Sequence, residues 1–295
     1  MSQSLEKEIK TTFRHKNLTE CPICRGEFYR EELLSGRGRL IAGNLTEELR
    51  REYQENKKFG ILYPLIYTVI VCPLCFYAAY SDDFPLPIKD VKSRLEVNTV
   101  ERTERIKTIF PQLDFNDDRT LEHGVASYIL AVTCYSFFDK KYAPSLKKAI
   151  SAIRACWTLE DLAKETGNEV YTNIKDIFYH KASIFYKNAV EYSQTGKEYL
   201  EGVKHYGPDI DKNFGYDGML YMASLLNFKR GFLEEDPEKR AETYIKSKRV
   251  ISKLFGIGKA SKDKPTAILD MARDLFEQIN NQLKELSEQL GKQFS

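Results

Sequence analysis

Two short cysteine motifs place the tightest constraint on this chain of 295 residues. Each reads Cys-Pro-x-Cys: the first supplies Cys21 and Cys24, and the second supplies Cys72 and Cys75. A Cys-x-x-Cys turn directs two sulfur atoms at one ion, and four thiolates satisfy a tetrahedral structural zinc. We therefore predict one structural zinc per chain, bound by these four cysteines in the N-terminal quarter.

The spacing leaves two other uses of these cysteines open. An iron centre of the rubredoxin kind uses the same four thiolates and is not excluded by spacing. A redox pair of the thioredoxin kind fits less well, because it needs a single pair at the start of a helix within a βαβ unit. Neither motif has that context, so zinc is the preferred interpretation.

Composition narrows the class of protein. Charged residues make up 30% of the chain and the formal net charge is +2, so bulk charge does not indicate a nucleic-acid coat or a membrane-surface protein. The polar, acidic N-terminus lacks the parts of a signal peptide, and the apolar run 61–71 is too short to span a bilayer as a helix. We expect a soluble cytoplasmic protein without a membrane partner, in which reduced cysteines bind metal instead of forming disulfides.

The composition also changes along the chain and predicts three parts. Residues 1–84 resemble short strands and turns, with a structured insertion between the cysteine pairs. Residues 85–118 contain prolines and a helix at about 90–109, and form a linker. Residues 119–295 are almost entirely helical in pattern. The expected fold is mainly α, with a small N-terminal β-rich zinc-knuckle domain.

The pattern also predicts individual elements. In the first part we expect a strand at 67–71, a weaker one at 27–30, and a short helix from 44 to about 56. The third part contains six amphipathic segments, at 121–138, 143–165, 170–195, 216–233, 237–255 and 264–290. Alanines and aromatic residues recur along them at helical spacing, which is typical of a tetratricopeptide-like helical array. An ordinary helical bundle is the alternative.

Several stretches together resemble a known bacterial family. They are Cys21-Pro22-Ile23-Cys24, the run from Tyr67 through Cys72-Pro73-Leu74-Cys75 to Ala79, Asp83-Phe84, Ala126–Ala131 and Ile153–Trp157. The chain is similar over roughly residues 15–200 to the family catalogued as domain of unknown function 2225. The resemblance implies a bacterial cytoplasmic protein with paired cysteine knuckles and tetratricopeptide-like helices, and implies no activity. Members commonly carry glycine after the second cysteine of each knuckle, where this chain has Arg25 and Phe76.

The remaining reactive residues fit structural roles. Cys134 and Cys156 lie in apolar helical segments and are expected to fill the core. The four histidines, His15, His123, His180 and His205, lack metal-binding spacing. The stretch Gly256-Ile257-Gly258-Lys259 resembles a phosphate-binding loop, but no strand precedes it, so a helix end fits better.

The sequence supports three candidate functions, and we assign no residue a catalytic role. The first is a non-enzymatic adaptor that binds a protein or peptide in the groove of the helical array, where exposed aromatic side chains would bind it. The alternative is a nucleic-acid-binding regulator that uses the zinc module and a local basic patch, although a solvated, salt-bridged surface is the simpler interpretation of these arginines. The residues of that patch are Arg30, Arg37, Arg39, Arg50 and Arg51. The third is a redox or electron-transfer protein that uses the Cys-x-x-Cys pairs.

Overall fold

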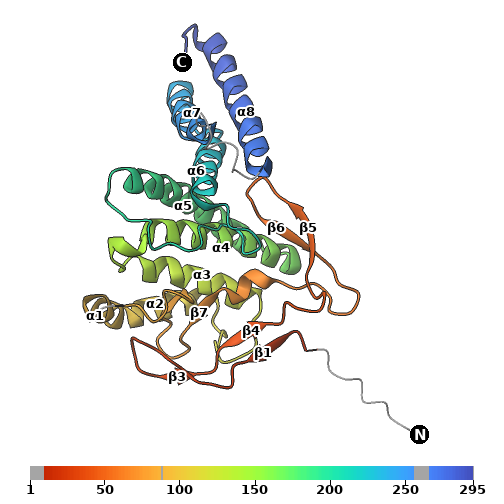
Figure 1. Cartoon of the computed structure of the whole chain (residues 1–295), viewed down its shortest axis with the longest axis vertical. Helices are drawn as coiled ribbons and strands as arrows, with labels where there is room; N and C mark the ends of the chain where they lie inside the picture. The colour runs from red at the N-terminus through yellow and green to blue at the C-terminus, as the bar shows by residue number, and fades with distance from the viewer. Residues whose placement is uncertain (1–9, 88, 256–265, 295) are drawn as a thin grey trace. The chain divides into compact units, whose positions relative to one another are not determined.

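The computed structural model describes residues 10–87, 89–255 and 266–294, which pack into two compact units. The first, here called the knuckle unit, holds the chain up to Thr46 together with Arg51–Phe137. The second, the helical unit, holds Glu47–Arg50 and the chain from Phe138 onward. Figure 1 labels most of the elements of both units. The fold is mainly α with a small β-rich N-terminal region, as the sequence predicts.

The β structure of the knuckle unit consists of short antiparallel pairs. β1 (Thr12–Arg14) pairs with β4 (Glu31–Leu33), and between them in sequence β2 (Thr19–Glu20) pairs with β3 (Glu27–Phe28). These strands are too short to bury a core of their own. The unit therefore depends on the helices and loops packed against them.

Two further pairs follow in the same unit. β5 (Ile41–Leu45) pairs with β6 (Arg51–Gln54), with an irregular register between Ala42 and Leu45. β7 (Val69–Val71) pairs with β8 (Ala78–Tyr80), and all three residues of β7 are buried. The predicted strand at 67–71 is confirmed at Val69–Val71. These three residues are β-branched, and β-branched residues favour strands. The first residue of the predicted strand ends the 3-10 turn η1 (Pro64–Tyr67).

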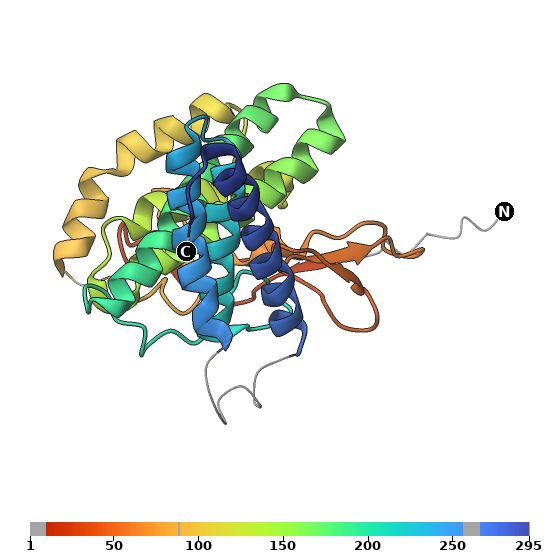
Figure 2. The ribbon, with the colours of Figure 1, turned by 90° about the horizontal axis from the view of Figure 1, so that it is seen from above.

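Two helices of the knuckle unit occupy the region in which the sequence predicts one. α1 (Lys89–Val97) and α2 (Thr99–Ile109) are separated by Asn98, and Figure 2 shows the break as a bend in the yellow ribbon. Asn98 lies between β-branched residues, which have lower helix propensity. The single helix predicted at about 90–109 is therefore divided.

α3 (Leu121–Tyr135) packs against β7 and β8 within the knuckle unit. The backbone N–H of Ala78 donates to Cys134 Sγ at 3.4 Å, and that of Tyr80 donates to Tyr135 Oη at 3.0 Å. These contacts group α3 with the strands, so the knuckle unit ends at Phe137, whereas composition places the start of the helical part at residue 119.

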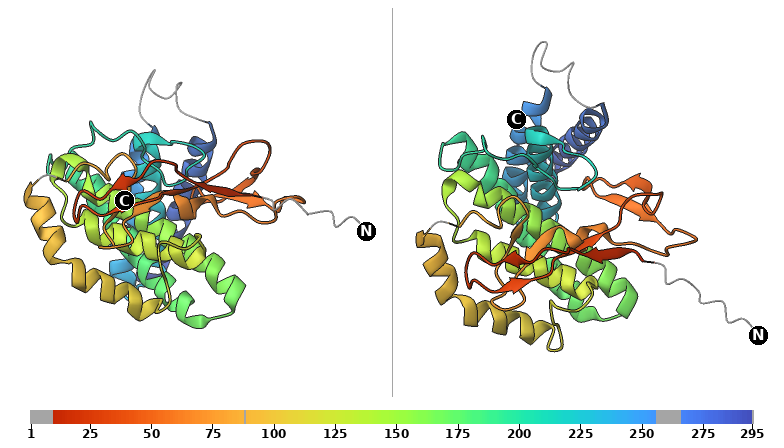
Figure 3. Two further views of the ribbon diagram at one scale, coloured as in Figure 1. Left: turned by 90° about the horizontal axis from the view of Figure 1, so that it is seen from below. Right: turned by 60° about the horizontal axis from the view of Figure 1, so that its bottom comes forward.

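Five long helices occur among the described residues of the helical unit, and each packs against the next. They are α4 (Pro144–Thr166), α5 (Glu169–Gln194), α6 (Gly215–Gly231), α7 (Pro237–Ser252) and α8 (Thr266–Leu290). The 3-10 turns η2 (Lys140–Tyr142) and η3 (Lys253–Phe255) precede α4 and follow α7. Figure 3 gives two further views of their ribbons, in green to blue. With α3, they confirm the six predicted helices to within a few residues at each end; whether they form tetratricopeptide-like repeats stays a prediction.

The helix predicted from 44 to about 56 is wrong, because this segment is the β5–β6 hairpin. Local sequence favours a helix start at Asn44, but the structure turns the chain at residues 46–50. Leu49 has a left-handed backbone (φ 59°) and is fully buried, so its burial overrides helix propensity. The Gly256-Ile257-Gly258-Lys259 stretch lies outside the described residues.

Candidate metal centre

The two cysteine motifs form two loops of matching design. Cys21 and Cys24 lie between β2 and β3, and Cys72 and Cys75 lie between β7 and β8. In each loop the first cysteine donates its N–H to the carbonyl five residues later, at 2.8 Å for Cys21 and 2.9 Å for Cys72. Its own carbonyl accepts from the N–H four residues later, at 3.0 and 2.9 Å. Each motif is thus a closed knuckle at the end of a short hairpin.

The residue after each second cysteine carries the turn. Arg25 has φ 63° and Phe76 has φ 54°, which is the left-handed region that favours glycine. The resemblance described above implies glycine at these two positions. The knuckle geometry therefore forms here without glycine, at a local conformational cost.

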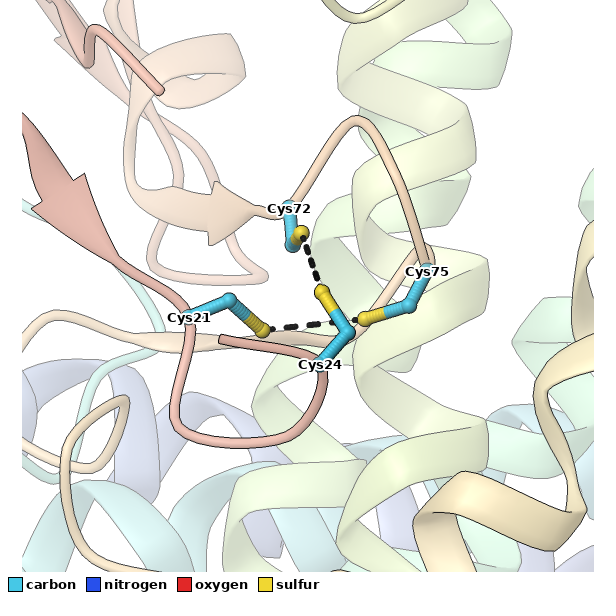
Figure 4. Close-up of side chains that lie close together, drawn as sticks. All are labelled: Cys21, Cys24, Cys72 and Cys75. Carbon is cyan, nitrogen blue, oxygen red and sulfur yellow. Dashed lines mark hydrogen bonds between the residues drawn. The ribbon is translucent and has the colours of Figure 1, made fainter. Parts of the chain in front are cut away.

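The four sulfur atoms converge on one point (Figure 4). All four lie within 4.8 Å of one another, and the Cys21–Cys75 and Cys24–Cys72 sulfur pairs are each 3.6 Å apart. A zinc ion with Zn–S bonds of about 2.3 Å holds its sulfurs about 3.8 Å apart by tetrahedral geometry. All four cysteines are free thiols, and their sulfurs are much too far apart for a disulfide of about 2.05 Å. The residues could therefore hold one metal ion.

Burial and charge explain why a cation suits this cluster. Cys21, Cys72 and Cys75 are buried, and Cys24 is exposed. Hydrogen bonds with Cys72 and Cys75, together with burial, raise the pKa of Cys21. Hydrogen bonds from Cys21 and Cys72 lower the pKa of Cys75 to about 2. Four thiolates within 4.8 Å of one another, three of them buried, would repel one another unless a cation lay between them.

Aromatic rings surround the second knuckle. Tyr77 is fully buried, its ring centre lies 4.9 Å from that of Phe84 in a tilted contact, and its hydroxyl donates to the Phe84 carbonyl at 3.0 Å. Phe76 meets Phe115 edge-on at 5.2 Å, and Phe28 meets Phe84 at 6.1 Å. The knuckles therefore lie against an apolar shell that restricts water at three of the four sulfurs.

The sequence interpretation missed Arg102, a residue beside this centre. Its side chain is 1% exposed, and Nε donates to the Cys75 carbonyl at 2.8 Å while Nη2 donates to Thr99 Oγ1 at 2.9 Å. Arg102 lies on the same stripe of α2 as buried Ile106, and a charge on an apolar stripe is the signal that marks it in the sequence. It fixes the carbonyl of one proposed ligand in place.

The other cysteines behave as the sequence predicts. Cys134 and Cys156 are 0% and 2% exposed, and each lies in a different unit from the other. Burial raises the pKa of Cys134 to about 11 and also raises that of Cys156. Both are core thiols, and neither belongs to the cluster.

The histidines and arginines lie elsewhere. His15 Nε2 lies 3.1 Å from Glu32 on the β1–β4 pair, and His123 caps α3 through Thr120. Arg30 pairs with Glu32, and Arg50 pairs with Asp161 at 2.5 Å in the helical unit. Two of the five arginines proposed for a basic patch are therefore neutralised by carboxylates, and nucleic-acid binding stays a prediction.

The helical unit contains a second candidate site, a cavity of about 540 Å³ between α5, α6 and α7. Val190 and Ala223 give it a buried apolar floor. The charged lining residues are Lys187, Glu191, Arg230, Glu234 and Lys246. Its lining contains no tyrosine or phenylalanine, so the exposed aromatics predicted for a groove do not occur in it.

Comparison with known proteins places most of this chain in one family. The model of the family described as "Uncharacterized protein conserved in bacteria (DUF2225)" matches residues 15–279, which include both knuckles and most of α8. The chain belongs to this family. The resemblance noted from the knuckles and the first helices thus extends almost to the C-terminus.

A relative in Borreliella burgdorferi (strain ATCC 35210 / DSM 4680 / CIP 102532 / B31), described as an uncharacterized protein, shares 42% identity over 278 residues. The alignment covers 94% of this chain and 99% of the relative. No solved structure matches the chain. No helix among the described residues is long and apolar enough to cross a membrane.

Proposed function

We propose that this protein is a non-enzymatic adaptor, in which the helical unit binds a segment of a partner protein and a structural zinc stabilises the knuckle unit. The observation that carries the proposal is the α5–α7 cavity, because its volume of about 540 Å³ is large enough to receive side chains of a partner segment.

Zinc is the metal that best fits the donor set. Four sulfur donors in near-tetrahedral spacing favour zinc or an iron–sulfur type centre over hard cations such as magnesium. Four protein ligands would fill the coordination sphere and leave no open position for a substrate, which supports a structural role. Such a site contributes on the order of 10 kcal/mol to folding, which strands of two to five residues need.

The cavity lining indicates the partner chemistry. Its buried apolar floor would accept an aliphatic side chain. Three cationic residues and two anionic residues line it, so the lining has a small positive excess and favours a segment with a carboxylate beside its apolar anchor. The proposed ligand is an extended or helical peptide with that pair of groups.

Site-specific photo-crosslinking tests this function. A benzophenone amino acid replaces Lys246, which lines the cavity on α7 and is 64% exposed. The matched control replaces Lys164 on α4, which is 68% exposed and makes the same kind of ion pair with a glutamate on its own helix. In the native bacterial host we expect a discrete adduct at position 246 and none at 164.

A cavity-filling variant completes the experiment. Ala223→Leu adds volume at the cavity floor, and we expect it to abolish the adduct at position 246 while the protein keeps its helical circular dichroism. Equal labelling at 246 and 164, or an adduct at 246 that survives Ala223→Leu, would contradict the proposed function.

A further inference from the structure

The four residues Glu47–Arg50, here called the 47–50 loop, are bound by the helical unit although β5 and β6 on either side of them belong to the knuckle unit. Leu49 is completely buried, and Glu48 is 17% exposed at its side chain. Turns at the ends of hairpins are ordinarily exposed and polar. This one instead makes side-chain and main-chain contacts with three successive helices.

Each helix supplies one donor to the carboxylate of Glu48. The indole N–H of Trp157 on α4 donates to Oε2 at 2.9 Å. The hydroxyl of Tyr179 on α5 donates to Oε1 at 2.7 Å, and the ammonium of Lys229 on α6 donates to the same oxygen at 3.0 Å. A carboxylate held by three donors from three elements is a recognition site for that group, because charge-assisted hydrogen bonds are the strong ones.

The neighbouring residues of the loop are recognised as well. Tyr221 donates its hydroxyl to the Glu47 carbonyl at 2.8 Å. The Arg50 guanidinium lies 2.5 Å from Asp161 and 5.9 Å from the centre of the Trp157 ring. The helices thus bind one main-chain carbonyl, one carboxylate and one guanidinium, and the leucine of the same turn is fully buried, which is the pattern of a bound peptide.

The backbone conformation of the loop at Leu49 is unfavourable by itself and is stabilised by burial of the side chain. Leu49 has φ 59°, a conformation that costs a residue other than glycine roughly 1–2 kcal/mol. Burial of the leucine side chain offsets this cost here, at about 2 kcal/mol for a residue removed completely from water.

We infer that helices α4, α5 and α6 form a peptide-recognition site for an acid–leucine–arginine turn, and that the 47–50 loop is its resident ligand, bound in cis. A partner segment with the same three groups competes with the loop, so the loop acts as an autoinhibitory latch. None of the residues that bind the loop lines the α5–α7 cavity, so this site is separate from the one in the proposed function.

The single tryptophan of the chain, Trp157, reports on the latch directly. It is 2% exposed and bonded to Glu48, so release of the loop uncovers it. The first experiment compares the emission of Trp157, and its quenching by acrylamide, in wild type, Glu48→Gln and Glu52→Gln. Glu52 is an exposed residue of the same hairpin and is the matched control. We expect a red shift and stronger quenching for Glu48→Gln only.

The second experiment supplies the loop in trans. Residues 46–50 are replaced by Asn-Gly, which favours a tight two-residue hairpin turn and keeps β5 and β6 paired. A synthetic peptide of residues 41–54 is then titrated into this variant while Trp157 emission is recorded. We expect a saturable return to the wild-type emission, and no return with the same peptide carrying Glu48→Ala.

The results of the two experiments either support the latch or overturn it. No saturable response from a variant that retains its helical circular dichroism overturns it, as does equal response to both peptides. If the Asn-Gly variant does not fold, the Glu48→Gln comparison decides: Trp157 emission and quenching unchanged from wild type overturn the latch, and uncovering specific to Glu48 supports it.

Discussion

At the scale of single residues, the knuckles show what sequence reasoning could and could not anticipate. The spacing of Cys21, Cys24, Cys72 and Cys75 predicts that their sulfurs meet, because two Cys-x-x-Cys turns have few other uses in one small unit. The left-handed backbone at Arg25 and Phe76 becomes visible only in the structure, since neither residue type signals a positive φ.

Substitution at Arg25 separates backbone cost from side-chain contribution. Arg25→Gly is expected to raise the free energy of unfolding by about 1 kcal/mol, because glycine adopts φ 63° without strain. The exposed ion pair with Glu20 that is lost contributes little. Phe76→Gly is expected to lower stability, since Phe76 is buried against Phe115. Urea unfolding of the metal-loaded protein measures both; a destabilised Arg25→Gly would contradict this account.

Glu48 gives a pH-dependent prediction. Burial alone would raise its pKa, but the charge of Lys229 and the hydrogen bonds from Trp157 and Tyr179 outweigh burial and lower the pKa below its ordinary value of 4.5. A lowered native pKa means that ionised Glu48 stabilises the fold above pH 4.5 and that this stabilisation is lost as the pH falls through the native pKa.

Glu48→Gln is therefore expected to lower stability by about 2 kcal/mol at neutral pH, since hydrogen bonds to a charged group are lost. The difference from wild type should shrink steadily below pH 4.5 and vanish once Glu48 is protonated in both states. Urea unfolding followed by Trp157 emission measures this difference. A gap between the two proteins that stays constant down to strongly acidic pH would refute the assigned role of the carboxylate.

At the scale of elements, the long helices could be predicted and the hairpin at 41–54 could not. The helices carry periodic apolar residues and local stop signals, such as Gly167 after α4 and the Asp236-Pro237 start of α7. The β5–β6 hairpin has a helix-like local sequence, and its turn is decided by contacts with Trp157, Tyr179 and Lys229, more than a hundred residues away. Local pattern contains no information about such partners.

The end of α4 tests the local stop signal. Gly167 has φ 67° and no atom within 4 Å of an added Cβ, so a substitution there acts through backbone conformation alone. Gly167→Ala is expected to lower the free energy of unfolding by about 1 kcal/mol. Gly202→Ala, at a glycine with equal open space and no positive φ, is the control and should be nearly neutral. Thermal unfolding followed by circular dichroism at 222 nm compares them; equal effects would mean that the αL conformation at Gly167 is not what matters.

At the scale of the whole molecule, the chain forms two compact units, and each unit is built from two separate segments of the sequence. Composition predicts the change from short strands to helices, but α3 has the composition of the helical part and packs with β7 and β8. The 47–50 loop lies between two strands of the knuckle unit but belongs to the helical unit, because Glu48 bonds to residues of α4, α5 and α6. A boundary drawn from composition therefore differs from the observed one at α3 and at the 47–50 loop. Composition shows that a segment can be buried, but it does not show which neighbour the segment packs against.

We propose that the four knuckle cysteines bind one structural zinc, and a measurement of metal content decides this. Protein purified without a chelating tag is analysed for zinc and iron as wild type, as the double variant Cys21→Ser/Cys72→Ser, and as Cys134→Ser. We expect one zinc per chain in wild type and in Cys134→Ser, and none in the double variant, which should also lose protease resistance in the knuckle unit. Iron in place of zinc, metal-free wild type, or zinc retained by the double variant would contradict it.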